Sequence, residues 1–571
     1  MQTLGISVAH DSAVCVVRDG EIVAYYKEER LVGQKHAKFP MAALQMVLNE
    51  FDYFDAIALC PVEEEPEFKE IILSHLNKYF DMSKTFVFDL SREHHLQHAS
   101  MAFYNSGFQT AAVVVVDRMG SGFGMALDDK GLPTGYAAVE CESIFSAKYP
   151  ADINSVYKNH WIMNEYAYHE IDRLKEQVPY IEFDASSQYG IVRVYESATT
   201  AIGQDALENG KVMGLAAYGD KRVKYPKFFV EGTHVPIDYY FKNKKVSDNF
   251  SQTVYRDFSQ AAEDFSEDNY QEYANLAYQV QKQTQEALGN LVEKAVKDTG
   301  EKNVVLVGGY AMNVVANSYL LKRFPKLNFY FEPVADDSGT AIGGAMFAYR
   351  IQSQDTKIRP QVDTFYHGIQ HDLSEIYGDD VTVSDIAELL SQDKSIAIFE
   401  GFAEAGQRAL GHRSILFNPL NKDAKALVNR IKNREWYRPF GAMVLEEDAK
   451  QYFDMSIQER NPYMTVAFDA KKGIAEMMPG IIHADNTCRI QTVGKDNPTI
   501  YALLKEFKKL TGHGVLLNTS FNLAGKPLIE SPRGALAVLD DSALDAVWFP
   551  EVEKLVAKAE YGIQETSKEI S

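Results

Sequence analysis

The chain has 571 residues, 46% hydrophobic and 24% charged, so it is too long for a single hydrophobic core and too apolar for wholesale disorder. Its formal net charge of -22 at pH 7 disfavours a polymeric nucleic acid partner unless a local basic patch overrides the average. The four cysteines form no CxxC pair, which argues against a disulfide framework and a thiolate zinc site. We therefore expect two or three domains and small-molecule ligands.

The amino terminus lacks the basic start and long apolar run of a signal peptide. No stretch reaches the roughly 18 uncharged apolar residues that a membrane span needs. We therefore expect a cytoplasmic protein without a membrane partner, and a homodimer is one assembly that the sequence allows.

The chain opens with apolar runs that predict a strand followed by a hairpin, whose turn lies at Asp19–Gly20. Further apolar runs bounded by turn residues predict strands at 111–117, 303–309 and 395–401. Apolar residues recur at three- and four-residue spacing over about 269–300, which predicts a helix that its last glycine ends. Strands that alternate with helices predict an α/β architecture.

A polar, proline-containing stretch around 351–365 is the clearest candidate domain boundary. It divides the chain into a first part, 1–355, and a second part, 356–571. The segment 220–268 is rich in Tyr, Phe, Lys and Asp, shows no clear period, and is interpreted as an insertion. No internal repeat is visible in the sequence.

Two histidines four residues apart, His94 and His98, occur in the run HHLQHA. A helix there would place both imidazoles on one face, where they could hold one metal ion. The alternative is a pair that lines a core helix, because such spacings also arise by chance. Asp117 ends a predicted strand and Asp337 precedes a predicted helix, where a lone carboxylate usually serves a turn or an N-cap. All four together would form a nitrogen and oxygen site suited to iron, manganese or zinc.

Paired glycines, Gly308 and Gly309, separate a predicted strand from a predicted helix in the run GGYAMN. Such a pair lets the backbone approach a ligand, and the helix N-terminus offers N–H donors to a phosphate. The motif alone is weak evidence, since many strand–helix turns carry one. The run NGKVMGLAAYG, 209–219, adds a second small-residue turn that contains Lys211.

Cationic residues are concentrated in two runs of the otherwise acidic second part, EGFAEAGQRALGHRS and NRIKNREWYRPF. They are Arg408, Arg413, Arg430, Lys432, Arg434 and Arg438. A solvated basic surface or local ion pairs would explain them, but arginine forks also match phosphate oxygens in pairs and so predict a phosphate-binding pocket. The run VLLNTSFN, 515–522, is a further candidate, because its amide and hydroxyl groups could bind a ribose or a phosphate.

The motifs match a known family when they are taken together. In family order along nearly the whole chain, the sequence carries AHDSA, EERLVGQKHAKFP, HHLQHASMAFY, VVVVD, GKVMGLAAYG, VGGYAMN, PVADDSGTAIGGA, GQRALGHRSIL, NREWYRPF, NTSFN and ESP. It thus resembles the O-carbamoyltransferases of nodulation and antibiotic biosynthesis. The resemblance implies an amino-terminal actin/Hsp70-like (ASKHA) domain, similar to the tRNA threonylcarbamoyl-transferase fold, followed by a YrdC-like α/β domain.

The resemblance also implies a two-step reaction. Carbamoyl phosphate and ATP, with Mg2+, would give carbamoyl adenylate in the second part, and the first part would pass the carbamoyl group to an alcohol. A shielded route between the two suppresses loss of isocyanate to water. Carried over by motif, the ligands of a ferrous ion would be His94, His98, Asp117 and Asp337.

The remaining site residues are implied in the same way. The transfer centre would contain His10, which would transfer a proton or orient the acceptor, and Lys35, which would stabilise negative charge. It would also contain His36. Local sequence alone instead indicates that Lys35 and His36 lie in an exposed basic loop. The nucleotide would contact Lys211, Gly308, Gly309 and Asn313. Carbamoyl phosphate and the ATP phosphates would be held by Arg408, Lys432, Arg434, Arg438 and Arg489, with Asn518, Ser520 and Asn522 completing that pocket.

Two positions depart from the family pattern. The turn Asp117-Arg118-Met119-Gly120-Ser121 lacks the family's usual glycine and Gly-Glu pair. Because this turn should border the acceptor or the nucleotide, the acceptor's identity cannot be copied from a known member. Gln407 replaces the usual proline before Arg-Ala-Leu-Gly, a change that we expect to be harmless.

The acceptor is left open among an antibiotic sugar, a Nod-type oligosaccharide and a hydroxymethylpyrimidine nucleotide. The high Tyr, Phe, Lys and Asp content indicates a lower-GC genome, which favours a bacterial or phage modification pathway. Such a pathway favours the nucleotide as the acceptor. The net charge disfavours modified DNA as the acceptor. Two rival functions are a tRNA threonylcarbamoyl-type transferase and a non-enzymatic ATP-binding regulator. The acidic charge disfavours the first, and neither the arginines nor the histidine pair fits the second.

Overall fold

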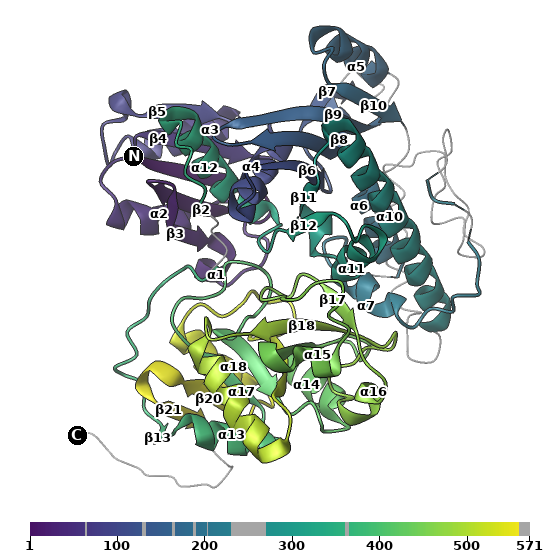
Figure 1. The fold of residues 1–571 in the computed structure, drawn as a ribbon. Coiled ribbons are helices and arrows are strands. Elements are labelled where there is room, and N and C mark those ends of the chain that lie inside the picture. The colour runs from purple at the N-terminus through teal and green to yellow at the C-terminus, as the bar shows by residue number, and fades with distance from the viewer. Residues whose placement is uncertain are drawn as a thin grey trace.

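The computed structural model describes residues 1–62, 66–127, 133–162, 166–186, 190–202, 204–225, 227–229, 270–359 and 365–558. Most of the predicted insertion therefore lies outside the described residues. Three β-sheets organise the fold, two in the first part and one in the second, which lies below the first part in Figure 1. No helix among the described residues is long and apolar enough to cross a membrane.

The first sheet has five strands in the order β3-β2-β1-β4-β5. They are β1 (Gln2–Val8), β2 (Ala13–Arg18), β3 (Glu21–Lys27), β4 (Ala56–Pro61) and β5 (Phe86–Asp89). The first three pair antiparallel, whereas β1, β4 and β5 run parallel. Helices α1 (Glu28–Val32), α2 (Met41–Glu50) and α3 (Pro66–Leu76) connect the later strands.

The second sheet repeats this order as β9-β8-β6-β11-β12 and adds β7 and β10. Its strands are β6 (Thr110–Val116), β7 (Gly122–Leu127), β8 (Pro133–Lys148), β9 (Asp152–Ile162), β10 (Glu182–Ser186), β11 (Asn303–Val307) and β12 (Asn328–Phe331). The pairing directions of the five common strands are also the same. The structure therefore contains a duplication that the sequence did not reveal, and the duplicated sheets confirm the predicted actin-like class for the first part.

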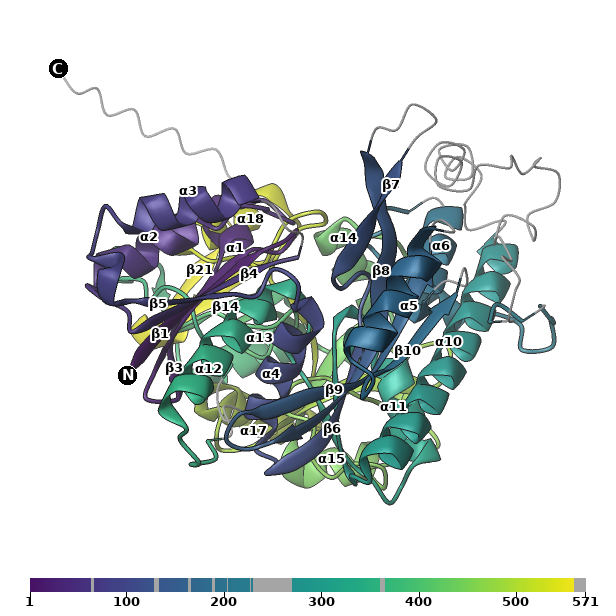
Figure 2. The ribbon, with the colours of Figure 1, turned by 90° about the horizontal axis from the view of Figure 1, so that it is seen from above.

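Two helices, α4 (His94–Ser106) and α12 (Thr340–Ser353), lie between the two sheets and pack against each other (Figure 2). Each is the last helix of its half, since α4 follows β5 and α12 follows β12. Their approach depends on Gly343, where a Cβ atom would lie 1.9 Å from the carbonyl oxygen of Gln97. Helices α5 (Tyr166–Gln177), α6 (Ile191–Ala201), α7 (Gly210–Ala216), α10 (Tyr270–Thr299) and α11 (Val314–Arg323) complete the second half.

The predicted elements of the first part are confirmed. The opening hairpin is β2 and β3, and the predicted strands at 111–117 and 303–309 are β6 and β11. The helix predicted at 269–300 is α10, and Gly300 follows it with a left-handed φ of 72°. The sequence predicted these strands because a strand buried on both faces is continuously apolar, as β6 is.

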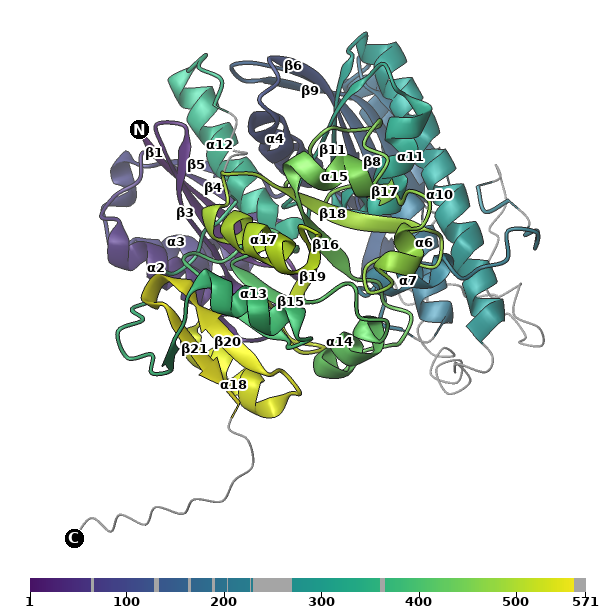
Figure 3. The same cartoon turned by 60° about the horizontal axis from the view of Figure 1, so that its bottom comes forward.

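The second part is built on one nine-stranded mixed sheet in the order β13-β21-β20-β14-β15-β19-β16-β18-β17 (Figure 3). Its strands are β13 (Asp379–Asp380), β14 (Ile396–Phe399), β15 (Arg413–Phe417), β16 (Gly441–Leu445), β17 (Ala467–Asp469), β18 (Thr487–Val493), β19 (Val515–Ser520), β20 (Ala546–Phe549) and β21 (Lys554–Ala557). Its helices are α13 (Val383–Ser391), α14 (Ala424–Lys432), α15 (Ala449–Tyr452), α16 (Ile474–Met477), α17 (Pro498–Thr511) and α18 (Pro532–Asp541). The α/β class is confirmed here too, while the YrdC-like assignment stays a prediction.

The two parts share a continuous core. One cluster of buried apolar side chains includes Val113 and Leu306 of the first part together with Phe417 and Tyr437 of the second. The predicted division at 355/356 falls between α12 and the first strand of the third sheet and remains a prediction. The shared core fixes the functional residues of one part relative to those of the other.

Candidate functional site

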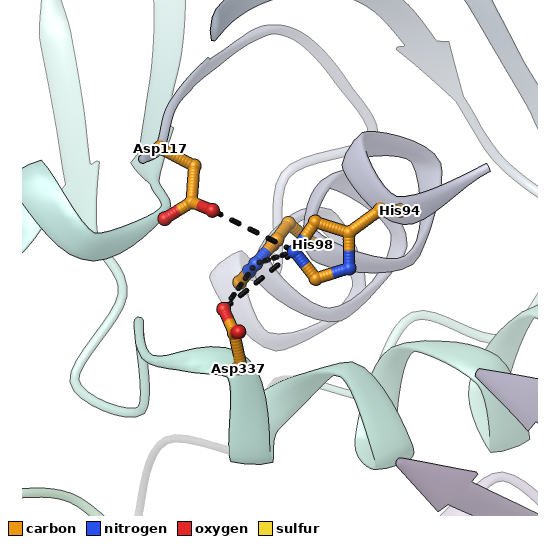
Figure 4. A group of neighbouring side chains, drawn as sticks. All are labelled: His94, His98, Asp117 and Asp337. Carbon is orange, nitrogen blue, oxygen red and sulfur yellow. Dashed lines mark hydrogen bonds and ion pairs between the residues drawn. The ribbon is translucent and has the colours of Figure 1, made fainter. Parts of the chain in front are cut away.

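The four predicted metal ligands meet between α4 and α12, and we call His94, His98, Asp117 and Asp337 the His/Asp cluster (Figure 4). The histidines lie in the first turns of α4, and Asp337 opens the short 3-10 helix η4 (Asp337–Gly339) directly before α12. Asp117 directly follows β6. The last helices of both halves thus supply ligands from equivalent ends, which explains how residues so far apart in the chain converge.

The distances within the His/Asp cluster are short and similar. The Nε2 atoms of His94 and His98 lie 3.2 Å apart, and Asp337 Oδ1 lies 3.5 and 3.4 Å from them. Asp117 Oδ2 lies 3.6 Å from His94 Nε2. All four side chains are buried. Burial disfavours the charged imidazole of His94, but the hydrogen bonds and charges of Asp117 and Asp337 outweigh it and raise its pKa to about 10.

This donor set fits a divalent cation. Four nitrogen and oxygen ligands about 2.1 Å from one ion, arranged as a tetrahedron, lie about 3.4 Å from one another. The separations that the structure shows between neighbouring ligand atoms run from 3.2 to 3.6 Å. Two ionised carboxylates and two neutral imidazoles carry a charge that one divalent ion would neutralise. The predicted ligand set therefore lies where a metal could use all four atoms.

His10 adjoins the His/Asp cluster from the turn between β1 and β2. Its Nε2 lies 3.4 Å from Asp337 Oδ2, the oxygen opposite the one that faces the α4 histidines. Asp11 approaches two rings at once, with Oδ2 lying 2.7 Å from His10 Nδ1 and Oδ1 lying 3.2 Å from His36 Nδ1. Burial lowers the pKa of His10, but the carboxylates of Asp337 and Asp11 outweigh it and raise that pKa to about 9. His10 and His36 are thus brought together, with one carboxylate between them.

The glycine pair supports the His/Asp cluster directly. The Gly309 N–H donates to Asp117 Oδ1 over 2.8 Å. Gly308 has a φ of 90°, and a Cβ atom there would lie 2.5 Å from the Val116 carbonyl oxygen, so only glycine fits. Asn313 caps α11 through the Ala316 N–H and also bonds Gln281, so its side chain has a structural role in the described fold.

Lys211 lies at the junction of the two parts, where it shares Glu435 with Arg438. Its ammonium group bonds Glu208 at 2.5 Å and Glu435 of the second part at 2.7 Å. It also donates to Gln204 Oε1. The predicted contact of Lys211 with nucleotide stays a prediction, since carboxylates already balance its charge.

Five cationic side chains of the second part come together, and we call them the cation cluster. Its members are Arg408, Lys432, Arg434, Arg438 and Arg489. Burial lowers the pKa of Arg408 well below its usual value, and the charges of Arg489 and Arg438 lower it further. Burial likewise lowers the pKa of Arg489 to about 10. Burial is the main cause of both lowered pKa values, and Arg438 lies close enough to Arg408 and Arg489 to add to them.

Carboxylates are scarce around the cation cluster. Within the described residues, the one ion pair of its members joins Arg438 to Glu435 at 3.4 Å. Arg434 instead donates to the Asn429 amide oxygen and the Pro439 carbonyl. The Nε atom of Arg489 is buried and has no hydrogen-bond partner among the described residues. A group of cations held by neutral acceptors is suited to binding an anion.

The predicted amide and hydroxyl groups hold the lysine of the cation cluster. Lys432 is buried and donates to Ser520 Oγ at 3.1 Å and to Asn522 Oδ1 at 2.5 Å. Asn518 donates to the Ala409 carbonyl, beside Arg408, at 2.8 Å. The run 515–522 therefore lines the cation cluster, and its predicted binding of a ribose or a phosphate stays a prediction.

Two arginines of the cation-rich runs have other surroundings. Arg413 is fully buried, lies 3.5 Å from the Phe399 ring centroid, and donates to the carbonyls of Glu400 and Gly401. Arg430 is exposed on α14. Local sequence could not separate these two from the clustered arginines, because all of them lie in the same short runs.

The two clusters are linked by contacts across the junction between the parts. Arg408 donates to the carbonyl of Met312, in the 3-10 turn η3 (Gly309–Met312) whose first residue bonds Asp117. From the first part, Lys35 is among the charges that lower the pKa of Lys432, after burial and the neighbouring arginines. The loop that carries Lys35 and His36 thus extends from the Asp11 carboxylate towards the cation cluster.

Sequence reasoning missed two residues and one contact of a third. Asp11 stands beside His10 in the AHDSA motif but was assigned no role. Asp336 directly precedes the ligand Asp337, and its Oδ2 accepts from Lys27 Nζ at 3.0 Å. The amide of Gln407 donates to the same oxygen at 3.0 Å, so a substitution expected to be harmless contacts the residue beside a predicted metal ligand. The position of Asp11 inside the AHDSA motif could have identified it as a candidate site residue. The contact of Gln407 could not be predicted, because it depends on the docking of the two parts.

Two family models match the chain. The model of the carbamoyltransferase N-terminus matches residues 62–346, and that of the carbamoyltransferase C-terminus matches residues 387–555. Together they cover well over half of the chain and both parts of the structure.

Similar proteins come from several bacteria. An uncharacterised protein of Synechocystis sp. is 27% identical over 93% of this chain and 93% of its own length. The nodulation protein NolNO of Sinorhizobium fredii is 26% identical over 94% of this chain and 78% of its own. The nodulation protein U of Bradyrhizobium diazoefficiens is 33% identical over 40% of each chain.

Similar solved structures are more distant. Component A of the (R)-2-hydroxyglutaryl-CoA dehydratase of Acidaminococcus fermentans covers 62% of this chain and 99% of its own, with 14% identity and a TM-score of 0.32. HypF of T. kodakarensis covers 62% of this chain and 48% of its own, with 12% identity and a TM-score of 0.35. Likenesses at this level carry no argument about function.

Proposed function

Since the chain belongs to the carbamoyltransferase family, we propose that it is an ATP-dependent O-carbamoyltransferase that uses carbamoyl phosphate. The carbamoyl group would pass through carbamoyl adenylate to a hydroxyl of a small-molecule or nucleotide acceptor. The observation that carries this proposal is the cation cluster, which has one ion pair with a carboxylate within the described residues and which Lys35, next to His36, approaches from the first part.

The cation cluster suits the first step, in which the reactants are rich in phosphate. Hydrolysis of carbamoyl phosphate would give carbamate and phosphate. Attack of the carbamate oxygen on the α-phosphorus of ATP would then release pyrophosphate and leave carbamoyl adenylate. Arg408, Arg434 and Arg489 would stabilise the negative charge on the phosphoryl oxygens in both stages, because their guanidinium groups have few competing anionic partners. Mg2+ would accompany ATP as it does in other nucleotide sites.

The transfer step would take place beside His10. With Asp11 accepting from its Nδ1–H, the neutral ring of His10 presents Nε2 as the atom that can accept a proton from the acceptor hydroxyl, and a pKa of about 9 means that this neutral form gains population as the pH rises. The hydroxyl oxygen would attack the carbamoyl carbon, and AMP would leave with the bonding electrons. Lys35 would stabilise the negative charge that develops on the carbamoyl oxygen. The ring of His36, held by the other oxygen of Asp11, would orient the reactants.

A divalent metal, ferrous iron by the family resemblance, would be held by His94, His98, Asp117 and Asp337 and would supply positive charge for orienting and polarising a bound oxygen. The residues around the ligands keep them in place whatever ion binds. Gly309 fixes Asp117 through its N–H, and Ser7 and Thr340 both donate to the backbone carbonyl of Asp337. The ligand loops are therefore organised by the fold itself.

The acceptor remains a hypothesis, and a hydroxymethylpyrimidine nucleotide is the leading one. The turn after Asp117 differs from the family pattern, and its Arg118 forms an ion pair with Glu196 at 2.8 Å. This pair lies next to the His/Asp cluster, where an acceptor hydroxyl would approach. A failure to carbamoylate hydroxymethylated nucleotides would turn the search to sugar and oligosaccharide hydroxyls.

The test is to incubate purified protein with ATP and carbamoyl phosphate, with and without ferrous iron, against a panel of alcohols. We expect carbamoyl-phosphate-dependent release of pyrophosphate and AMP, and a carbamoyl mass gain on one acceptor. Arg434→Met should abolish both products, whereas Arg430→Met, which changes an exposed arginine of α14, should leave them unchanged. ATP binding without either product would contradict the proposal and favour the regulator.

A further inference from the structure

One two-residue segment of the second part touches the loop that carries Asp337 and the turn whose first residue bonds Asp117. Gln407 donates from Nε2 to Asp336 Oδ2 at 3.0 Å, and Asp336 directly precedes Asp337. The next residue, Arg408, donates to the Met312 carbonyl at 3.0 Å. Met312 ends the turn that begins at Gly309, the residue that bonds Asp117.

The Asp336 end of this contact is buried and hydrogen-bonded. Asp336 is 4% exposed, its Oδ2 accepts from the buried Lys27, and its Oδ1 accepts from Ser338 Oγ. The hydroxyl of Tyr25 in turn donates to Ser338 Oγ at 2.7 Å. A shift of Asp336 would therefore disturb a buried ion pair and displace Asp337, since the two residues are adjacent.

The Gln407 end is exposed, but it is joined to a member of the cation cluster. Arg408 is held by one neutral carbonyl and is repelled by Arg489 and Arg438. An anion bound to this group would remove that repulsion and fix the guanidinium. Because Gln407 and Arg408 are consecutive, fixing one limits the movement of the other.

We propose that Gln407 is a positioning residue that couples anion binding at the cation cluster to divalent-metal binding at the His/Asp cluster. The coupling rests on the proposed roles of the two clusters and is independent of the acceptor. An anion on Arg408 orders the segment 407–408, Gln407 then holds Asp336, and the loop of Asp337 loses less freedom when a metal binds. The two ligands therefore strengthen each other's binding, and thermodynamic linkage makes the factor equal in both directions.

The direct field between an anion and a metal also favours joint binding, so the experiment must separate it from the contact through Gln407. Gln407→Met keeps the length of the side chain and removes the amide donor. Gln407→Glu keeps the shape and places a carboxylate against Asp336. Gln407 is exposed, so both variants should fold, and thermal melting checks this. Lys322→Gln is the matched control, because it removes another contact between the parts, the ion pair with Asp469 at 2.5 Å.

The measurement is the dissociation constant of Co2+, followed by its visible absorption on metal-free protein, with and without saturating sulfate. Sulfate is used because it resembles phosphate in shape and charge but binds divalent metals weakly. Arg434→Met, which should not bind sulfate, reports any effect of sulfate on free Co2+. The reciprocal titration measures sulfate binding with and without Co2+.

We expect sulfate to tighten Co2+ binding about five- to tenfold in the natural chain and in Lys322→Gln, and Co2+ to tighten sulfate binding by the same factor. In Gln407→Met the factor should fall to twofold or less, while the affinity of each ligand alone stays unchanged. In Gln407→Glu we expect the factor to fall below that of Gln407→Met. An unchanged factor in both Gln407 variants would overturn the proposal and leave the direct field as the link.

A natural chain that binds both ligands without coupling would also overturn the inference, but the proposed function would stand. A chain that binds neither sulfate nor Co2+ would overturn both, since the two clusters would then lack their proposed roles. The binding measurements need no turnover, so the two failures are distinguishable.

Discussion

The His/Asp cluster and the cation cluster lie close together, yet they handle buried charge in opposite ways. In the first, two imidazoles stand beside two carboxylates at 3.4 to 3.6 Å, so opposite charges can balance. In the second, five cations have one ion pair with a carboxylate within the described residues, and burial together with neighbouring cations lowers the pKa of Arg408 and Arg434. The opposite charges of the His/Asp cluster stabilise it in the free protein. The like charges of the cation cluster repel one another, so the surrounding fold must hold that cluster together.

The difference teaches where ligand binding should stabilise the molecule most. A group of like charges costs stability until an anion arrives, so ligand binding there relieves an existing cost. A cluster of mixed donors has no such cost, and a metal adds its own binding free energy. The predictions below test this contrast, beginning with the largest expected effect.

Arg489→Met should reduce carbamoyl-phosphate-dependent pyrophosphate release by about 100- to 1,000-fold, because a cation that stabilises phosphoryl charge is lost. The same change should raise the free energy of unfolding by about 1 kcal/mol, since it removes a guanidinium that like charges repel. Initial rates and urea denaturation measure the two effects.

Arg413→Met provides the contrast. This arginine is fully buried, stacks on Phe399 and donates to two backbone carbonyls. Its loss should lower the free energy of unfolding by about 3 kcal/mol, because buried acceptors lose their donor. If Arg489→Met destabilised the chain as much as Arg413→Met, the cation cluster would not be an uncompensated one.

Metal binding should stabilise the natural chain by about 2.7 kcal/mol at a free metal concentration 100 times the dissociation constant. His98→Ala should lose this gain, because one of the four converging ligands is removed. Urea denaturation with Mn2+ and with a chelator measures the gain, in the absence of oxygen where iron is used. His513→Ala, which changes a half-buried histidine of the second part, is the control and should keep the gain in stability. Retention of the full gain in His98→Ala would exclude the His/Asp cluster as the metal site.

Asp11→Asn should separate the two steps of the reaction. An asparagine has a single acceptor oxygen, so it cannot accept from the Nδ1–H groups of both His10 and His36. We expect the carbamoylated product to form about 10- to 100-fold more slowly, through kcat rather than through KM for the acceptor, while pyrophosphate release is retained. Asp372→Asn, at an exposed turn, is the control. Equal loss of both products would show that Asp11 acts on the first step or on folding.

Glu332 is a buried carboxylate of the first part that has no ion-pair partner among the described residues, and it gives the smallest predicted effect. Burial raises the pKa of Glu332 to about 7, although bonds from Val334, Asn105 and Tyr330 oppose the shift. Because the folded pKa lies above the unfolded value, the stability contributed by protonated Glu332 is present below about pH 4.5 and is lost as the pH rises through about 7.

Glu332→Gln should therefore stabilise the chain more at pH 8 than at pH 5, by an amount on the order of 1 kcal/mol. Urea denaturation of both proteins at the two values measures the difference. Glu50→Gln, whose partner Tyr26 lies at the edge of the first sheet, tests whether any glutamate change gives the same pH dependence. A stabilisation by Glu332→Gln that is independent of pH would contradict the assigned cause.

Much of the fold could be predicted from the sequence, because buried strands and long helices leave continuous or periodic apolar patterns. The spacing of His94 and His98 likewise predicted their shared face, and the position of Asp117 after a strand predicted its emergence at a sheet end. These inferences need local geometry alone. The roles of the ligands are still proposals, since no bound ion tests them.

The rest depended on contacts between distant segments. The duplication escaped notice because strand order and pairing direction can recur while side chains differ. Arg413 and Arg434 belong to similar cationic runs, and only the packing of Arg413 on Phe399 separates them. Asp11 meets His36 across 25 residues, and Gln407 meets Asp336 across 71, so neither contact leaves a pattern in the local sequence.

The packing of α12 on β1 has a consequence for the order in which the chain is made. Ser7 bonds the carbonyl of Asp337, and Thr3 bonds that of Ala345, over separations of 330 and 342 residues. A ribosome that adds about 5 to 20 residues per second needs roughly 20 to 70 seconds to cover that distance. During that interval the nascent first sheet lacks the helix that covers one of its faces, and a chaperone or an early α4 must shield it. Until then, no metal can meet all four of its proposed ligands.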